Sequence, residues 1–170
     1  MGRSRLGLWI FAVATLIVGS FIATSPANAV AGAQWANLGN GLCLTATGGS
    51  GAPVVQTPCD TVNRPLSQQW DISGQHLFNV ENNLCMDAQG GATNGTRIIT
   101  WPCNSISNEN WSIPTSSTTG FVTIRSRVSN TNSHCLDVPQ QTTVVNTQLQ
   151  LWSCNGTVAQ GWYNTPTIIT

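Results

Sequence analysis

Short apolar runs separated by turn residues recur along the chain after residue 30, and none has the period of an amphipathic helix. Asn-Gly pairs, Gly-Gly pairs and clusters of Ser and Thr divide runs that are rich in Val, Ile, Leu and Trp. This pattern is typical of short strands joined by tight turns. We therefore expect an all-β fold beyond residue 30.

The run 149–152 predicts which side chains face the core. Side chains of a strand alternate between two faces, so Leu149 and Leu151 share one face while Gln150 and Trp152 share the other. Because leucine favours the interior, we expect Gln150 and Trp152 to point outward. This strand therefore predicts an exposed indole beside an amide.

The same succession of motifs occurs three times after residue 30. Each unit contains a Cys followed by Leu or Met, then a second Cys after a short run, and finally a closing Trp. The closing residues are Trp70, Trp111 and Trp162, which we interpret as structural, and they are 41 and then 51 residues apart. Three units are too few for a typical propeller, so we expect a β-trefoil whose repeats share one core around a pseudo-threefold axis.

The cysteines follow the same threefold pattern. Fifteen pairings of six cysteines are possible, but short sequence gaps alternate with long ones and favour one disulfide in each repeat. The chain has no Cys-x-x-Cys motif and its two histidines stand apart, so we expect no metal and no other cofactor. The expected pairs are Cys43–Cys59, Cys85–Cys103 and Cys135–Cys154.

Residues 1–29 have the pattern of a secretory signal peptide. Arg3 and Arg5 precede an apolar run, and Ala27-Asn28-Ala29 fits a cleavage site. The alternative is an uncleaved membrane anchor, although the run 6–22 is at the lower length limit for a membrane span. We expect a secreted protein with one domain, residues 30–170, and no membrane span after cleavage.

The charge of the chain argues against nucleic-acid binding. All six basic residues are arginines and are matched by six acidic residues, and charged residues make up 7% of the sequence. Removal of the leader leaves four arginines against six acids. No basic surface is available to bind a phosphate backbone.

The repeated motifs resemble the ricin B-type lectins. The chain has Cys-[Leu/Met]-Asp, x-x-Trp-x-Cys and Gln-x-Trp motifs at the expected period over about residues 34–163, with Glu-x-Trp in the second unit. The resemblance implies a β-trefoil with a shallow pocket in each repeat, usually for galactose-type sugars. It implies that the Asp accepts hydrogen bonds from sugar hydroxyls and the aromatic residue stacks on the ring. An Asn-Gln pair completes the polar contacts.

The three repeats carry these residues unequally. The first has Thr45, Thr57 and Ser67 at the positions of the Asp, the aromatic residue and the Asn, so we expect no sugar pocket there. Glu109 places a second carboxylate near the acid of the second repeat, which lowers affinity unless an amide or a water separates them. The expected carbohydrate-binding residues are Asp87, Trp101, Asn108 and Glu109 in the second repeat, and Asp137, Gln150, Trp152 and Gln160 in the third, where Ala159 replaces the Asn.

Other interpretations remain open at this point. Trp101 and Trp152 could be buried, and the two aspartates could cap turns. The leading hypothesis is a secreted protein that binds galactose-type glycans or a polysaccharide; the alternative is a secreted protein-interaction module or protease inhibitor. An enzyme would need a proton-transferring pair such as Asp87 and Glu109, and because repeat three has an amide in place of Glu109, we expect no enzyme.

Overall fold

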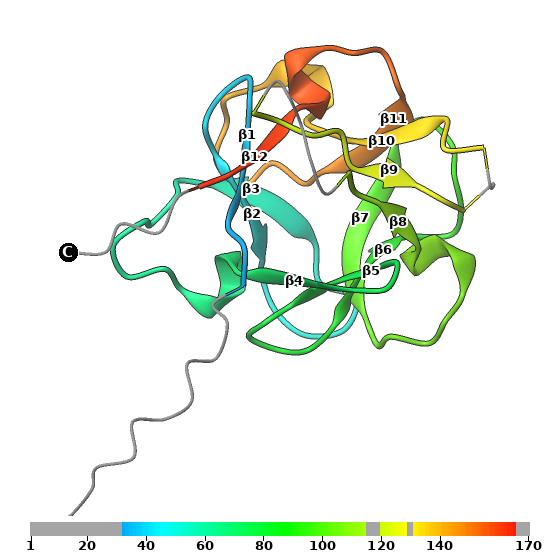
Figure 1. The fold of residues 1–170 in the computed structure, drawn as a ribbon, viewed down its shortest axis with the longest axis horizontal. Helices are drawn as coiled ribbons and strands as arrows, with labels where there is room; N and C mark the ends of the chain where they lie inside the picture. The colour runs from blue at the N-terminus through cyan, green and yellow to red at the C-terminus, as the bar shows by residue number, and fades with distance from the viewer. Residues whose placement is uncertain (1–31, 115–119, 129–130, 166–170) are drawn as a thin grey trace, which may run out of the picture.

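The computed structural model describes residues 32–114, 120–128 and 131–165 (Figure 1). Within these ranges the chain forms twelve short strands and four 3-10 helices, as expected for an all-β protein. None of these helices has the length and apolarity that a bilayer crossing needs. The predicted signal peptide lies outside the described residues.

The twelve strands form three repeats of four. Repeat one contains β1 (Trp35–Asn37), β2 (Cys43–Ala46), β3 (Val54–Thr57) and β4 (Trp70–Ser73). Repeat two contains β5 (His76–Asn79), β6 (Cys85–Ala88), β7 (Thr96–Trp101) and β8 (Trp111–Ser112). Repeat three contains β9 (Arg125–Ser126), β10 (His134–Asp137), β11 (Gln150–Ser153) and β12 (Trp162–Asn164).

A 3-10 helix precedes the last strand of each repeat. These helices are η1 (Leu66–Gln68), η2 (Ser107–Glu109) and η4 (Val158–Gln160). An additional 3-10 helix, η3 (Pro139–Gln141), follows β10. Each of the three matching helices therefore carries the residues just before a closing tryptophan.

Strand pairing confirms the β-trefoil. The last strand of each repeat pairs antiparallel with the first strand of another, as β4 with β5, β8 with β9 and β12 with β1. The two middle strands of each repeat form a hairpin. In Figure 1 the repeats follow one another around a common centre, from blue and cyan through green to yellow and red.

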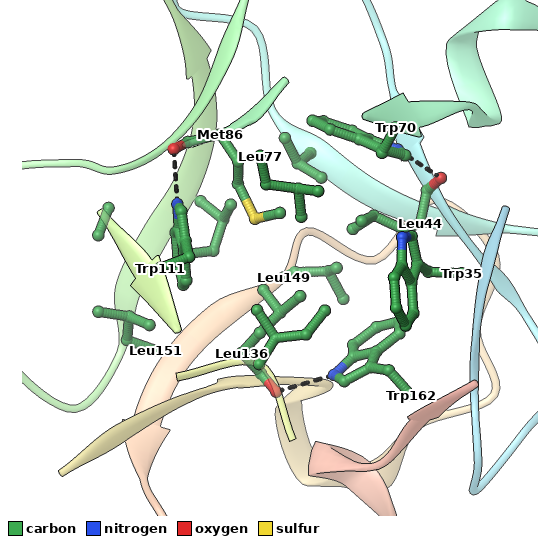
Figure 2. Packing of buried hydrophobic residues seen from close by; sticks show 14 of the residues in the cluster. Trp35, Leu44, Trp70, Leu77, Met86, Trp111, Leu136, Leu149, Leu151 and Trp162 are labelled. Carbon is green, nitrogen blue, oxygen red and sulfur yellow. Dashed lines mark hydrogen bonds between the residues drawn. The ribbon is translucent and has the colours of Figure 1, made fainter. Parts of the chain in front are cut away.

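The closing tryptophans build the shared core with the same hydrogen bond in each repeat (Figure 2). All three indoles are buried, which confirms their structural assignment. Each indole N–H donates to the carbonyl oxygen of the residue that follows the first cysteine of its own repeat. The pairs are Trp70 with Leu44 (3.1 Å), Trp111 with Met86 (2.8 Å) and Trp162 with Leu136 (3.1 Å).

The predicted disulfides are all present, as Cys43–Cys59, Cys85–Cys103 and Cys135–Cys154. Each one joins the first strand of a hairpin to the segment just after the second. The disulfide therefore holds this segment next to the hairpin that precedes it.

Candidate functional site

The register of the hairpins brings the predicted acid and aromatic residues to neighbouring positions. In β10–β11, Asp137 pairs with Gln150 and Cys135 with Trp152. Cross-strand partners and residues two apart along a strand share one face of the sheet. Asp137, Gln150 and Trp152 therefore lie on the same face, while Leu149 and Leu151 are buried on the other, as the alternation predicts.

A cavity of about 330 Å³ opens on this face of repeat three. Trp152 lies at its wall with 40% of its surface exposed. Ala159, at the position where the resemblance implies an Asn, also lines it. The complete wall consists of Asp137, Val138, Pro139, Gln140, Gln141, Gln150, Trp152, Asn155, Thr157 and Ala159.

Two glutamines hold the Asp137 carboxylate in place. Gln150 Nε2 donates to Oδ1 (2.8 Å) and Gln160 Nε2 donates to Oδ2 (3.1 Å). Gln160 is buried and does not line the cavity; it also donates to the carbonyl oxygen of Ser153 and accepts the N–H of Asn155. The structure thus places Gln160 behind the wall, where it positions the acid.

A smaller cavity of about 180 Å³ occupies the corresponding place in repeat two. Asp87 pairs with Ile99 across β6–β7, and Trp101 is 42% exposed. Asn108 Nδ2 donates to Asp87 Oδ2. The wall consists of Asp87, Gln89, Gly90, Ile99, Trp101 and Asn108. Three of the four predicted residues come together here, Asp87 and Trp101 from the hairpin and Asn108 from η2, whereas Glu109 does not line the cavity.

Glu109 is fully buried beneath this second cavity. Its Oε2 accepts the backbone N–H of Asn104 (2.9 Å), and its Oε1 has no hydrogen-bond partner among the described residues. Like Gln160, it lies behind the wall of its pocket. The expected second carboxylate near Asp87 is therefore present, and the Asn108 amide, which lines the cavity, donates to Asp87.

Burial raises the pKa of both pocket aspartates. For Asp87 the main cause is desolvation; the hydrogen bond from Asn108 opposes this pKa shift and the nearby Glu109 adds to it. For Asp137 the pKa is also raised mainly by desolvation, against hydrogen bonds from Gln150 and Gln160. Both carboxyls are thus held at sites where ionisation depends on neighbouring amides.

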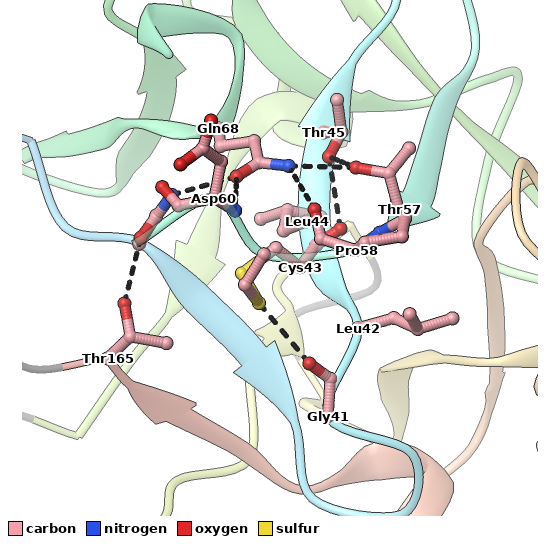
Figure 3. Close-up of a disulfide and its surroundings, with 12 residues drawn as sticks. Gly41, Leu42, Cys43, Leu44, Thr45, Thr57, Pro58, Asp60, Gln68 and Thr165 are labelled. Atoms are coloured by element: carbon pink, nitrogen blue, oxygen red, sulfur yellow. Dashed lines mark hydrogen bonds between the residues drawn. A yellow bond between two sulfur atoms is a disulfide. The ribbon is translucent and has the colours of Figure 1, made fainter. Parts of the chain in front are cut away.

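Repeat one lacks this arrangement, as the sequence predicts (Figure 3). Thr45 Oγ1 and Thr57 Oγ1 are 2.7 Å apart and bond to each other. Gln68 Nε2 donates to Thr57 Oγ1 (2.8 Å) instead of to a carboxylate. A hollow of about 470 Å³ remains nearby but has no aromatic wall; it is lined by Ala46, Thr47, Gly48, Ser67, Glu81 and Asn82.

Several loop residues that line the third-repeat cavity were not predicted as site residues from the sequence. Gln140 and Gln141 line the third-repeat cavity with φ angles of 53°, a left-handed conformation that non-glycine residues rarely adopt. Asn155 and Thr157 form a turn in which Thr157 donates to Asn155 Oδ1. The Asn-Gly-Thr sequence was a signal for this turn, whereas Gln140 and Gln141 gave none.

No set of three potential metal ligands occurs within the described ranges.

The family model of the ricin-type beta-trefoil lectin domain matches residues 33–162 of the chain. Two curated proteins share shorter segments with it. Serine protease 1 of Rarobacter faecitabidus is 31% identical over 90 residues, 53% of this chain and 17% of the protease. Polypeptide N-acetylgalactosaminyltransferase 14 of Homo sapiens is 35% identical over 80 residues, 44% of this chain and 14% of the transferase. The chain thus matches less than a fifth of the length of these relatives.

Solved structures share the fold. The designed 3-fold symmetric protein ThreeFoil is 19% identical with a TM-score of 0.69, and the match covers 79% of this chain and 97% of that protein. The ricin B-like lectin of Macrolepiota procera, solved in complex with lactose, is 18% identical with a TM-score of 0.64, covering 78% and 92%. At these identities the similarity establishes the fold alone.

Proposed function

Because this chain belongs to the family of ricin-type β-trefoil lectin domains, we propose that it is a secreted lectin for galactose-type sugars or a polysaccharide. The binding sites of the proposal are the two cavities of repeats two and three. Repeat one takes no part, because a pair of threonines replaces its acceptor and its aromatic plate.

One observation carries the proposal: in repeat three a buried carboxylate, an amide and a half-exposed indole share one face of a hairpin and line a cavity. A sugar ring offers many hydroxyls and one apolar C–H face. Hydrogen bonds from hydroxyls to a carboxylate are stronger than neutral ones, and an indole offers a flat apolar area. Asp137, Gln150 and Trp152 supply both kinds of contact.

Repeat two supports a weaker or more selective site. Asp87, Asn108 and Trp101 provide the acceptor, the amide and the plate, but Ile99 replaces Gln150 and the cavity is about half as large. One hydroxyl-binding amide is therefore missing from this wall. The proposal gives repeat three the broader set of polar contacts.

Galactose-type sugars are the first ligands to test, since a ricin B-like lectin of the same fold was solved with lactose. Secretion is supported by the leader pattern of residues 1–29 and by one disulfide in each repeat. The proposal includes no catalysis. Glu109 is buried outside its cavity, and its counterpart Gln160 is an amide that cannot transfer a proton to a leaving group.

A glycan-binding screen of wild type, Asp87→Ala, Asp137→Ala and the double variant tests the proposal. We expect wild type to bind galactose-terminated glycans, each single variant to bind less, and the double variant to bind none while its tryptophan fluorescence stays native. Unchanged binding by the double variant contradicts the assigned pockets. A blank screen of the wild type favours a protein-interaction module or protease inhibitor.

A further inference from the structure

Glu109 occupies the place that a glutamine holds in the other two repeats. One side-chain oxygen of each residue accepts a backbone N–H from the segment after the second cysteine of its repeat. The pairs are Gln68 with Asp60 (3.1 Å), Glu109 with Asn104 (2.9 Å) and Gln160 with Asn155 (2.9 Å). The three side chains therefore have the same orientation, and their second terminal atoms occupy equivalent positions.

That second atom is a hydrogen-bond donor in repeats one and three. Gln68 Nε2 donates to Thr57 Oγ1 and to the carbonyl oxygen of Pro58. Gln160 Nε2 donates to Asp137 Oδ2 and to the carbonyl oxygen of Ser153. In both of these repeats the position thus faces two acceptors and is held by an atom that carries hydrogen.

In repeat two this position is held by Glu109 Oε1. The oxygen is buried without a hydrogen-bond partner among the described residues. By correspondence with Asp137 and Ser153 of repeat three, the acceptors of repeat two are the Asp87 carboxylate and the carbonyl oxygen of Pro102, neither of which donates. Burial of an unpaired carboxylate oxygen is costly, and two neighbouring carboxyls resist joint ionisation.

We propose that Glu109 and Asp87 hold one proton between them, so that a Glu109 O–H replaces the Gln160 N–H and keeps Asp87 in position to accept a sugar hydroxyl. This inference rests on the proposed function only for the part that concerns sugar. Glu109 is thus a positioning residue of the repeat-two pocket, and its effect on Asp87 depends on the presence of the proton.

No cationic side chain of the described residues hydrogen-bonds to Asp87 or Glu109 and offsets the repulsion between their carboxyls. Asp87 is the one charged side chain on β6, against which η2 packs, and Asn108 is the neutral donor that η2 contributes. The Glu109 charge raises the pKa of Asp87 in addition to the effect of burial. No arginine or histidine of the described ranges hydrogen-bonds to either carboxyl, so the shared proton is what reduces their repulsion.

The two pockets should therefore differ in their response to pH. In repeat two, binding weakens in acid as Asp87 takes up a proton, and it weakens again at higher pH as the pair loses its last proton. The loss at higher pH is at most tenfold in affinity per pH unit, since one proton is linked to binding. In repeat three the Gln160 amide donates at any pH, so only the acid loss occurs.

The proton itself is tested without any sugar, by following side-chain carboxyl ¹³C shifts of the full chain as the pH is raised. We expect the carboxyl shift of Asp87 to follow two coupled steps as the pH is raised, because the shared proton links this carboxyl to Glu109. In Glu109→Gln, Asp87 should titrate in one step. A single-step Asp87 curve that Glu109→Gln leaves unchanged overturns the proposal.

The effect on binding is tested with lactose as the probe and with one pocket silenced. Repeat two is measured in Asp137→Ala, where Glu109→Gln should abolish the weakening at higher pH. Repeat three is measured in Asp87→Ala, where Gln160→Glu should introduce it. Equal pH profiles with and without Glu109→Gln contradict the role in binding. If no variant binds lactose, the galactose part of the proposed function fails instead, and the carboxyl titration still decides whether the proton is shared.

Discussion

At the scale of single residues, a tryptophan serves either the fold or the candidate site according to its place relative to the disulfide. Trp162, beyond the second cysteine of its repeat, is buried and donates to the Leu136 carbonyl oxygen. Trp152, two residues before that cysteine, is 40% exposed at the wall of a cavity. Substitution of the two should therefore have different consequences.

Trp152→Ala should lower the lactose affinity of repeat three at least tenfold, or about 1.4 kcal/mol, because the sugar ring loses the indole on which it stacks. The melting temperature should change little, since much of this side chain is already in water. The matched change Trp162→Ala should destabilise the fold by about 3–5 kcal/mol through a core cavity. Titration calorimetry measures the loss of affinity, and thermal unfolding measures the loss of stability. Equal destabilisation by both variants would contradict the assignment of Trp152 to the site and Trp162 to the core.

Asp137 should give repeat three an acid limit to binding. Burial raises the pKa of this carboxyl, so its ionised, hydroxyl-accepting form is lost at a higher pH than that of a free aspartate, about 3.9. Lactose affinity, measured in Asp87→Ala to silence repeat two, should fall as the pH drops through this raised pKa. Gln150→Leu removes a hydrogen bond that favours ionisation and should move the fall to still higher pH. Constant affinity down to pH 4 would be inconsistent with this view.

The sequence predicts exposed site residues better than the buried ones behind them. Alternation along a strand is a local property, so the outward direction of Gln150 and Trp152 follows from Leu149 and Leu151 alone. The place of Gln160 depends on how η4 packs against β10, which is a tertiary contact with no local pattern. The Gln-x-Trp motif thus identified Gln160, which contacts Asp137 but does not line the cavity.

At the scale of elements, the framework of each candidate pocket is a hairpin together with the segment that a disulfide joins to it. In repeat three the Cys135–Cys154 bond lies between Trp152 and Asn155, both of which line the cavity. The strand pattern and the cysteine spacing predict this framework. The loop after β10 could not be predicted, because glutamine rarely adopts the left-handed conformation that Gln140 and Gln141 have here.

Replacement of Cys135 and Cys154 by alanine should lower the free energy of unfolding by about 3 kcal/mol and also weaken lactose binding by repeat three. The change releases the segment that carries Asn155. The Cys43–Cys59 disulfide closes a loop of similar length. Its removal is the matched control, which should cost about the same stability and leave binding unchanged. Denaturant unfolding and calorimetry test this; equal loss of binding in both variants would show that the disulfides act only through global stability.

At the scale of the whole molecule, the trefoil holds the two candidate pockets in a fixed relation. Strand β7 of repeat two pairs directly with β11 of repeat three, through Arg97 with Gln150 and Thr96 with Leu151. These strands also carry Trp101 and Trp152. One continuous sheet thus connects the two plates.

This rigid connection predicts avidity on a surface that displays many galactose groups. Once one pocket is occupied, the second meets a high effective concentration of sugar, and the apparent affinity can exceed that of one site by 10²-fold or more. Asp87→Ala and Asp137→Ala should each remove this gain, while the remaining pocket keeps its affinity for free lactose. Surface plasmon resonance at high lactose density, compared with calorimetry in solution, separates the two quantities.

Repeat one supplies the control for this experiment, because Glu81 is the carboxylate at its hollow and no aromatic plate faces it. Glu81→Ala should leave both surface avidity and solution affinity at wild-type values. If Asp87→Ala binds the dense surface as tightly as the wild type, repeat two makes no contribution and the molecule is monovalent. If Glu81→Ala also loses avidity, the third hollow binds sugar after all, and the trefoil uses all three of its repeats.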